Sequence, residues 1–280
     1  WELSLTWRDK IKTDWSYDVT LALADAQATI TKFENPSGAL PASNRYYVGQ
    51  KLGEIWGYQT VGLFQTQDEV NNAPDQSRIG NNWRPGDVQY ADLNGDGIIS
   101  PGKNTLDDPG DRTIIGNSTP RYSFGINTSI AYKNFRLTAF FQGIGQVDHW
   151  PSSGNWTWFF PYNAGHVERY YITDTWTPEN PNAYFPAAHI STSDKKNLQT
   201  QSRYLQSAAY IRAKNITLSY TLPQSVISKI KMSRAQVFVS GMNLFEFTKI
   251  RKPLDPESIQ SGAIEYPMQR IGTIGLNVSF

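Results

Sequence analysis

Cysteine is absent from the sequence, which excludes disulfide bonds, thiolate catalysis and cysteine-ligated zinc. Charged residues are scarce as well: they make up 18% of the chain and nearly cancel to a net charge of +1. No basic stretch is present that would follow a phosphate backbone, so we expect no nucleic acid as a partner. Aromatic residues, at 13%, suit a surface that contacts lipid or ligands through rings.

Long hydrophobic runs are also missing. No segment approaches the roughly 20 consecutive apolar residues of a membrane-spanning helix, and the mean hydropathy is −0.49. This excludes a helical membrane protein but not a transmembrane β-barrel, whose strands alternate between lipid-facing and lumen-facing residues. The sequence starts at Trp1 without a signal-peptide pattern, so we expect further sequence upstream.

What the sequence does contain is a two-residue alternation of apolar and polar side chains, in segments about ten residues long. One face of each segment is apolar and the other polar, which predicts amphipathic β-strands. The turn at Lys133-Asn134 predicts a tight hairpin. The alternating segments are residues 1–8, 15–24, 122–132, 135–142, 215–222 and 273–280, and further strands are expected near 52–64 and 235–247.

The connections between these segments alternate between very short and very long. The polar stretches 65–120 and 143–204 have the length of external loops, and the short links have the length of periplasmic turns. A soluble β-sandwich that binds glycans or mediates adhesion remains the alternative, because its strands also alternate. Rings at the strand ends favour the barrel, as in an aromatic girdle at a membrane interface: Trp1, Trp7, Trp15, Tyr122, Tyr132 and Tyr220.

Six short motifs carry a more specific resemblance. The run GDVQYADLNGDG at residues 86–97 resembles a signature of the SusC-like (SusC/RagA family) TonB-dependent transporters. The other motifs follow in the order of that family: DRTIIGN at 111–117, PRYSFG at 120–125, YIRAKNITL at 210–218, GMNLF at 241–245 and DPE at 255–257.

The resemblance implies an all-β fold. Residues 1–280 would be the C-terminal part of a large antiparallel transmembrane barrel of about 22 strands, with 65–120 and 143–204 as long extracellular loops and with the plug and earlier strands upstream. Phe280 would be the terminal assembly signal of an outer-membrane barrel.

The same resemblance implies active import of oligosaccharides or peptides across the outer membrane of a Gram-negative cell. The implied partners are a SusD-like surface lipoprotein, the TonB complex through the missing N-terminal part, and outer-membrane lipid. The substrate class, glycan or peptide, stays open.

A candidate calcium loop lies inside the first motif. Residues 92–100 match the first nine positions of an EF-hand-like loop, and position 12 is Lys103 rather than glutamate. Asp107, Asp108 or Asp111 would then have to complete the ligand shell. Consecutive tight turns are the alternative interpretation. The expected oxygen ligands are Asp92, Asn94, Asp96, the carbonyl of Ile98 and Ser100.

The segment 143–204 is rich in aromatic residues that either stack on a ligand or partner or form a small core within the loop. The binding candidates are Trp150, Trp156, Trp158, Tyr162 and Trp176. The histidines are isolated, and no nucleophile, metalloprotease or phosphate-binding motif is present. The sequence therefore predicts no enzymatic activity.

Overall fold

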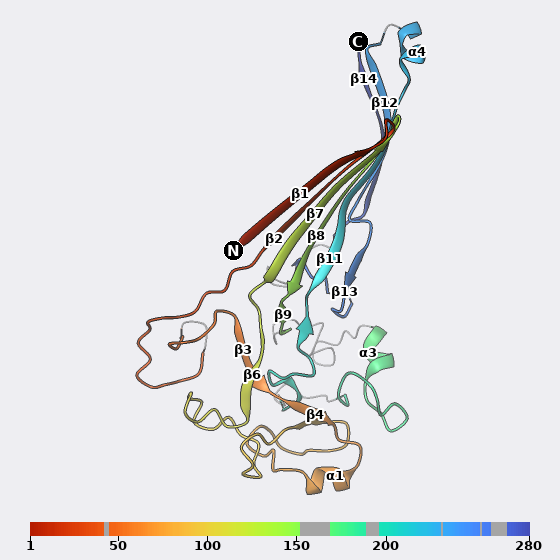
Figure 1. Cartoon of the computed structure of the whole chain (residues 1–280). Helices are drawn as coiled ribbons and strands as arrows, with labels where there is room; N and C mark the ends of the chain where they lie inside the picture. The colour runs from red at the N-terminus through yellow and green to blue at the C-terminus, as the bar shows by residue number, and fades with distance from the viewer. Residues whose placement is uncertain (42–44, 152–168, 189–195, 231, 253, 259–267) are drawn as a thin grey trace. The chain divides into compact units, whose positions relative to one another are not determined.

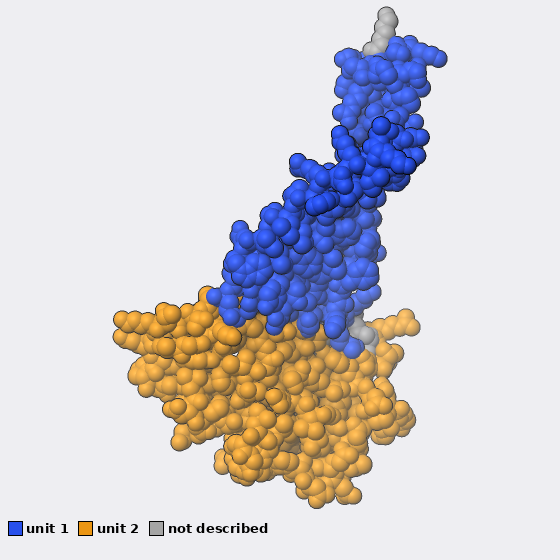
Figure 2. Space-filling model, viewed as in Figure 1, with its two compact units in different colours: residues 1–27, 120–147, 207–280 blue, residues 28–119, 148–206 orange. Residues whose placement is uncertain are grey.

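A computed structural model describes residues 1–41, 45–151, 169–188, 196–230, 232–252, 254–258 and 268–280. These residues form two compact units (Figures 1 and 2), and each is treated by itself. Unit 1 comprises 1–27, 120–147 and 207–280, and unit 2 comprises 28–119 and 148–206. Within the described ranges, no helix is long and apolar enough to cross a membrane.

Unit 1 is an antiparallel sheet whose strands follow one another in sequence order. Its outermost strands on the described path are β1 and β14. A short strand, β13 (Glu246–Thr248), pairs with β11 beside that path, and α4 (Gln224–Ile227) and η2 (Ser228–Ile230) connect β11 to β12. The main strands are β1 (Glu2–Ile11), β2 (Trp15–Ala24), β7 (Arg121–Tyr132), β8 (Phe135–Gln146), β11 (Tyr210–Thr221), β12 (Arg234–Met242) and β14 (Ile271–Ser279).

The strand register places the apolar side chains of unit 1 on one face of the sheet. Because successive side chains point to opposite faces, residues paired across strands share a face. The alternation predicted from the sequence is thereby confirmed. One row of paired residues runs across the sheet through Tyr17, Ile130, Leu137, Leu218, Val239 and Ile274.

Aromatic residues form a further row, at the end of the sheet where the Lys133-Asn134 turn lies. Trp15 pairs with Tyr132, which pairs with Phe135, which pairs with Tyr220. The ring centroids are 4.4 Å apart for Trp15 and Tyr132 and 4.6 Å for Phe135 and Tyr220. These strand-end rings are spread over some 200 positions of the sequence, and the strand register places them side by side in one band.

Within the described residues, the apolar face of unit 1 is exposed rather than covered by a second sheet. Exposed fractions are 66% for Trp7, 78% for Ile274 and 62% for Leu276. A β-sandwich would bury this face against its other sheet. The structure therefore disfavours the sandwich alternative.

Unit 2 contains short strand pairs connected by long irregular segments. Strand β3 (Glu54–Tyr58) pairs with β6 (Arg112–Asn117), and β4 (Thr60–Leu63) pairs with β5 (Val88–Tyr90). Its remaining elements are α1 (Gln67–Asn72), β9 (Asp148–His149), α3 (Arg169–Asp174) and η1 (Lys196–Leu198), and β10 (Gln206–Ser207) pairs with β9.

The strand expected near 52–64 exists as β3 and β4, and both strands belong to unit 2, which begins at residue 28. The loop bounds 65–120 and 143–204 stay predictions. Alternation identifies a strand without identifying its sheet. The placement of β3 in unit 2 depends on the close approach of another segment of that unit: a Cβ on Gly57 would lie 2.5 Å from the carbonyl oxygen of Thr200.

A buried ion pair organises the core of unit 2. Lys196 Nζ lies 2.7 Å from Asp87 Oδ2, and the two side chains are 1% and 0% exposed. The same ammonium donates to the carbonyl of Asn82 at 2.8 Å. Asp87 Oδ1 accepts from the amide of Asn197 at 2.8 Å, and Asn197 Oδ1 accepts from the N–H of Val88. Each charge therefore has several partners, as a charge removed from water requires.

Amide and phenol groups extend this network. Gln76 Oε1 accepts from the N–H of Tyr90, and Gln76 Nε2 donates to the carbonyl of Val88. The Tyr90 hydroxyl donates to the carbonyl of Lys196 at 2.6 Å and accepts from Gln201 Nε2 at 3.2 Å. The GDVQY portion of the first motif is consequently a core element of unit 2, joined by polar side chains to residues more than a hundred positions away.

We expect Lys196→Ala to destabilise unit 2 by about 3–5 kcal/mol, because the variant leaves the Asp87 carboxylate buried without its cation. Lys103→Ala is the matched control: that lysine side chain is 82% exposed and lies 3.9 Å from Asp108, so its loss should cost about 0–1 kcal/mol. Limited proteolysis of the full-length protein in urea reports the difference. Equal protection of both variants would contradict the structural role of the buried pair.

Candidate functional site

The candidate calcium loop is folded into a series of turns held by its own carboxylates. Asp92 Oδ1 accepts from the N–H of Gly95 at 2.7 Å, and Asp92 Oδ2 accepts from the N–H of Gly97 at 2.8 Å. Gly95 and Gly97 have φ of +76° and +78°, which favours glycine at both positions. These hydrogen bonds, chiefly the one from Gly97, hold the pKa of Asp92 below its usual value.

The remaining predicted ligands take part in similar contacts. Asp96 Oδ1 accepts from the N–H of Ile98 at 2.8 Å, and Asn94 Oδ1 accepts from the N–H of Asp96 at 3.0 Å. Ser100 Oγ accepts from the N–H of Gly102 at 3.2 Å. In the described part of the chain, no three histidine or acidic side chains are gathered in a way that could hold a metal ion. The predicted Ca²⁺ would have to rely on two carboxylates plus neutral oxygens, and calcium binding stays a prediction.

Asp111 closes this segment from the far side. Its side chain is fully buried, with Oδ1 accepting from the N–H of Leu93 at 2.8 Å and Oδ2 accepting from the N–H of Ser100 at 2.7 Å. Two of the sequence motifs, at 86–97 and 111–117, are therefore joined by a carboxylate that bridges the two ends of the turn.

The aromatic candidates fall into two groups. Trp156, Trp158 and Tyr162 lie outside the described residues, so their predicted role stays a prediction, as does that of Trp150, which is half-buried. Trp176 is 8% exposed, and its indole N–H donates to Gln65 Oε1 at 3.1 Å. A Cβ on Gly86 would lie 2.4 Å from the Trp176 ring.

Other rings of this region form a small core. Tyr171 and Phe185 have centroids 4.4 Å apart, and Tyr184 and Tyr204 have centroids 5.2 Å apart. Tyr171, Phe185 and Tyr204 are buried. For Trp176 and these rings, the structure favours the second interpretation of the aromatic segment, a core that holds a long loop together.

A cluster of charges connects two further motifs within unit 1. Arg212, which is 2% exposed, contacts Glu246 and lies 2.6 Å from Asp255 and 3.1 Å from Glu257. Lys214 Nζ lies 3.0 Å from Glu257 Oε2. The basic residues of the YIRAKNITL motif thus bind the acidic residues of the DPE motif. The pairing was not predicted, although opposite charges in two separate motifs were its signal.

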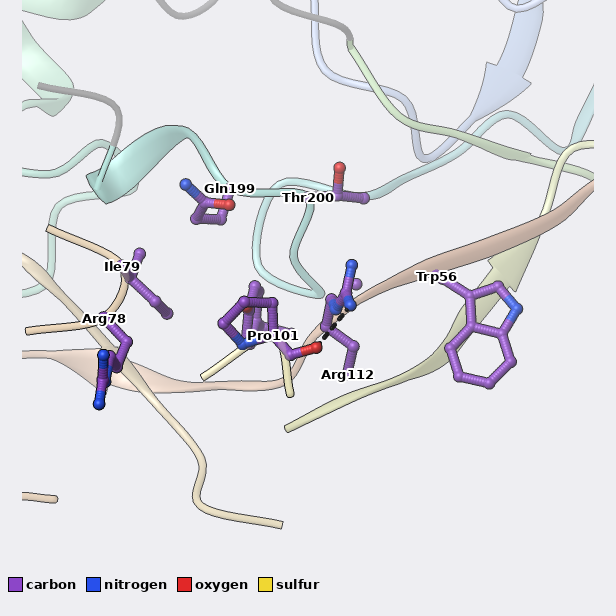
Figure 3. Close-up of a pocket in the computed structure, with 9 residues that line it drawn as sticks. Trp56, Arg78, Ile79, Pro101, Arg112, Gln199 and Thr200 are labelled. Atoms are coloured by element: carbon purple, nitrogen blue, oxygen red, sulfur yellow. Dashed lines mark hydrogen bonds between the residues drawn. The ribbon is translucent and has the colours of Figure 1, made fainter. Parts of the chain in front are cut away.

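A cavity of about 200 Å³ in unit 2 is the most distinctive candidate for ligand binding. Figure 3 shows Arg78 and Trp56 at opposite ends of the view and Pro101 and Arg112 between them. The lining comes from β3, from the start of β6 and from the segments around residues 78–79, 101 and 199–200.

The backbone contacts of β3 position this cavity. The N–H of Tyr58 donates to the carbonyl of Thr200 at 2.8 Å, and the N–H of Ser202 donates to the carbonyl of Tyr58 at 3.0 Å. Tyr58 pairs with Arg112 across the strands. Burial raises the pKa of Tyr58 to about 12, and the positive charge of Arg112 opposes that rise. The phenol is therefore neutral at physiological pH, and the arginines supply the charge of the cavity. The sequence alone does not point to these residues, because the cavity lining comes from five separate segments.

Comparison with known proteins shows what this chain is similar to. No family model matches the chain. "TonB-dependent receptor P3" of Formosa agariphila is 29% identical over 248 residues, which cover 83% of this chain and 22% of that protein. "TonB-dependent receptor P26" of the same organism is 27% identical over 258 residues, or 85% of this chain and 24% of that protein. The chain is a homologue of the TonB-dependent receptors. It spans about a quarter of the length of these curated relatives.

Solved structures with a similar fold match the whole length of this chain. A structure described as the RagAB peptide transporter superposes with a TM-score of 0.70 at 20% identity, covering 100% of this chain and 29% of that one. A structure of the RagAB peptide importer in the "open-open" state gives 0.68 at 19% identity, covering 100% and 28%. The predicted resemblance and all-β class are confirmed. The predicted location, the outer membrane of a Gram-negative cell, is confirmed, and the curated relatives are named receptors.

We expect the stability of the turn at 92–100 to depend on the charge of Asp92. Its folded-state pKa is depressed, so the stabilisation is present above the usual aspartate pKa of about 3.9 and is lost as the pH falls through the lower folded value. Asp92→Ala should remove it at every pH. Hydrogen exchange of the Gly95 and Gly97 amides measures both effects, with Lys103→Ala as the control.

Calcium provides a separate test of the same turn. If Asp92 and Asp96 bind Ca²⁺, the ion should protect residues 87–111 of the wild-type protein from proteolysis. The double variant Asp92→Ala/Asp96→Ala should lose that protection. Identical wild-type cleavage in calcium and in chelator would mean that the segment is a turn only.

Proposed function

We propose that the protein containing this chain is an outer-membrane transporter that actively imports oligosaccharides or peptides. In this proposal the sheet of unit 1 is part of a transmembrane barrel of about 22 strands, and unit 2 is built from its extracellular loops. The observation that carries the proposal is the exposed apolar face of unit 1, because water is an unfavourable neighbour for it and hydrocarbon a favourable one.

The two faces of the sheet agree with a barrel wall. On the face opposite the apolar one, Asn127, Thr217 and Ser240 are polar, with Thr217 and Ser240 hydroxyls 2.8 Å apart. Arg212 and Gln142 are paired on this same side. A face with hydroxyl, amide and charged groups suits a water-filled lumen, whereas the aromatic row at the turn end suits a membrane interface.

The edges of the sheet support the need for further strands. Both β1 and β14 have a partner on one side only along the described path of the sheet. An open edge in hydrocarbon would leave backbone groups without hydrogen bonds at several kcal/mol each. We infer that upstream strands complete the wall, and that Phe280, which is 85% exposed, acts as the assembly signal beside them.

The partners follow from the family resemblance. A SusD-like surface lipoprotein would cover the extracellular loops, and the TonB complex would act through an N-terminal plug. Structural neighbours described as peptide transporters support a peptide as substrate. The tryptophans of segment 143–204 favour a glycan, because aromatic rings stack on sugar faces, but the burial of Trp176 weakens that argument. Both substrate classes therefore remain within the proposal.

Leu137→Arg should destabilise the membrane-inserted protein by about 2–4 kcal/mol, because it places a charge in lipid near the midplane. The neighbouring change Arg136→Leu is the matched control, since residue 136 points to the opposite face and its replacement should cost much less. Folding in liposomes, followed by heat-modified gel mobility, compares the two. Equal losses would contradict the assignment of the faces.

Import itself can be tested in cells. Deleting the gene should abolish growth on the cognate oligosaccharide or peptide. A TonB deletion should have the same effect, because the proposed import is driven through TonB by the proton gradient across the inner membrane. Uptake of fluorescent glycan and peptide mixtures distinguishes the substrate classes. Undiminished uptake in the TonB deletion strain would contradict active import.

A further inference from the structure

The two arginines that line the cavity of unit 2 have no acidic partner. Arg112 Nε donates to the carbonyl of Pro109 at 3.4 Å, and Nη2 donates at 2.8 Å to the carbonyl of Pro101 and at 2.8 Å to Asn104 Oδ1; all three acceptors are neutral. For the described residues, Nη1 of Arg112 has no acceptor, and the side chain of Arg78 has neither hydrogen bond nor ion pair. Arg112 is half-buried and Arg78 is exposed.

The acidic residues nearby are satisfied by other groups. Asp111, adjacent to Arg112, accepts from the N–H groups of Leu93 and Ser100. Asp75 accepts from the N–H and the hydroxyl of Ser77 at 2.9 and 2.8 Å. Arg78 contributes to lowering the pKa of Asp75, after the two hydrogen bonds from Ser77, but no ion pair forms between them within the described structure. Neither carboxylate therefore accepts a hydrogen bond from Nη1 of Arg112 or from the guanidinium of Arg78.

Two other basic residues of unit 2 have acidic partners. Lys196 lies against Asp87, and Lys103 lies near Asp108. A planar guanidinium presents parallel N–H donors that match the two oxygens of a carboxylate. A half-buried guanidinium without an anion is thus prepared to bind one from outside the protein.

The size and remaining lining of the cavity limit what enters it. At about 200 Å³ it is smaller than the roughly 300–1,000 Å³ of sites for drug-sized molecules, so it accommodates one unit of a longer substrate. Trp56 and Ile79 add apolar surface, and Gln199 and Thr200 add polar groups.

We propose that this cavity binds a carboxylate-bearing unit of the imported substrate, with Arg78 and Arg112 as its anion-recognising residues. The carboxylate belongs either to an acidic sugar or to an acidic amino-acid side chain. The inference rests on the proposed function, since it specifies the chemistry of the substrate at a site in the extracellular loops.

Matched probes isolate the carboxylate. The full-length receptor in detergent is titrated calorimetrically with trigalacturonate and with neutral trigalactose, and separately with the capped tripeptides Ala-Glu-Ala and Ala-Gln-Ala. We expect the acidic member of one pair to bind roughly tenfold or more tightly than its neutral counterpart, as for hydrogen bonds to a charged group. The pair that shows the difference identifies the source of the carboxylate.

Arg78→Gln tests the residues, because this side chain has no hydrogen bond or ion pair to lose in the described structure. The variant should weaken binding of the acidic probe about tenfold and leave binding of the neutral probe unchanged. Arg112→Lys keeps the charge but not the planar guanidinium, so it should weaken binding of the acidic probe less than Arg112→Gln does. Lys103→Gln removes one positive charge from a side chain that does not line the cavity and should have little effect.

The inference is overturned if neither pair shows a preference for the acidic member, or if Arg78→Gln and Lys103→Gln have the same effect. Uptake in cells is measured in parallel. Import that proceeds without dependence on Arg78 and Arg112 refutes the anion site alone, whereas arginine-dependent binding without import refutes the transport proposal alone.

Discussion

The side-chain period of a β-strand is the constraint on which unit 1 depends. Because successive residues alternate between faces, a slip of one position in any strand pair would move a complete set of apolar side chains to the polar face. In the row through Ile130, Leu137 and Leu218 the register is kept from strand to strand. A bulge in β11 between Ala213 and Asn215 shifts the register once and lets Arg212 lie on the same face as Thr217.

A different interaction holds unit 2, where strands are short and most of the chain is irregular. Its backbone N–H and C=O groups cannot all form hydrogen bonds to neighbouring strands, and polar groups of buried side chains take the place of the missing strand partners. Gln76 binds the backbone of Val88 and Tyr90 as a neighbouring strand would. The Asp87–Lys196 pair then ties this strand to a distant segment. A loop region stabilised in this way presents fixed cavities, such as the one lined by Arg112, on a surface otherwise made of turns.

The motifs acquire physical meaning from these contacts. Asp87 of the first motif is a buried anion, Asp111 of the second bridges the ends of a turn, and Arg212 is neutralised by Glu246 and Asp255. Each is a polar residue whose partner lies in another part of the sequence. Leaving any of these charges buried and unpaired would be costly.

The strands of unit 1, their faces and the resemblance to TonB-dependent transporters follow from the sequence alone, because a period of two residues and short ordered motifs are local properties. The turn of Asp92 is local as well, since its glycines and carboxylate act within a few residues of one another. The sequence does not show that 52–64 belongs to unit 2, that Trp176 is buried, or that Arg78 and Arg112 line one cavity. Those outcomes depend on pairings between distant segments, as when the Thr200 carbonyl approaches Gly57. Only the tertiary structure decides them, because alternation specifies which face a side chain takes but not which segment will cover it.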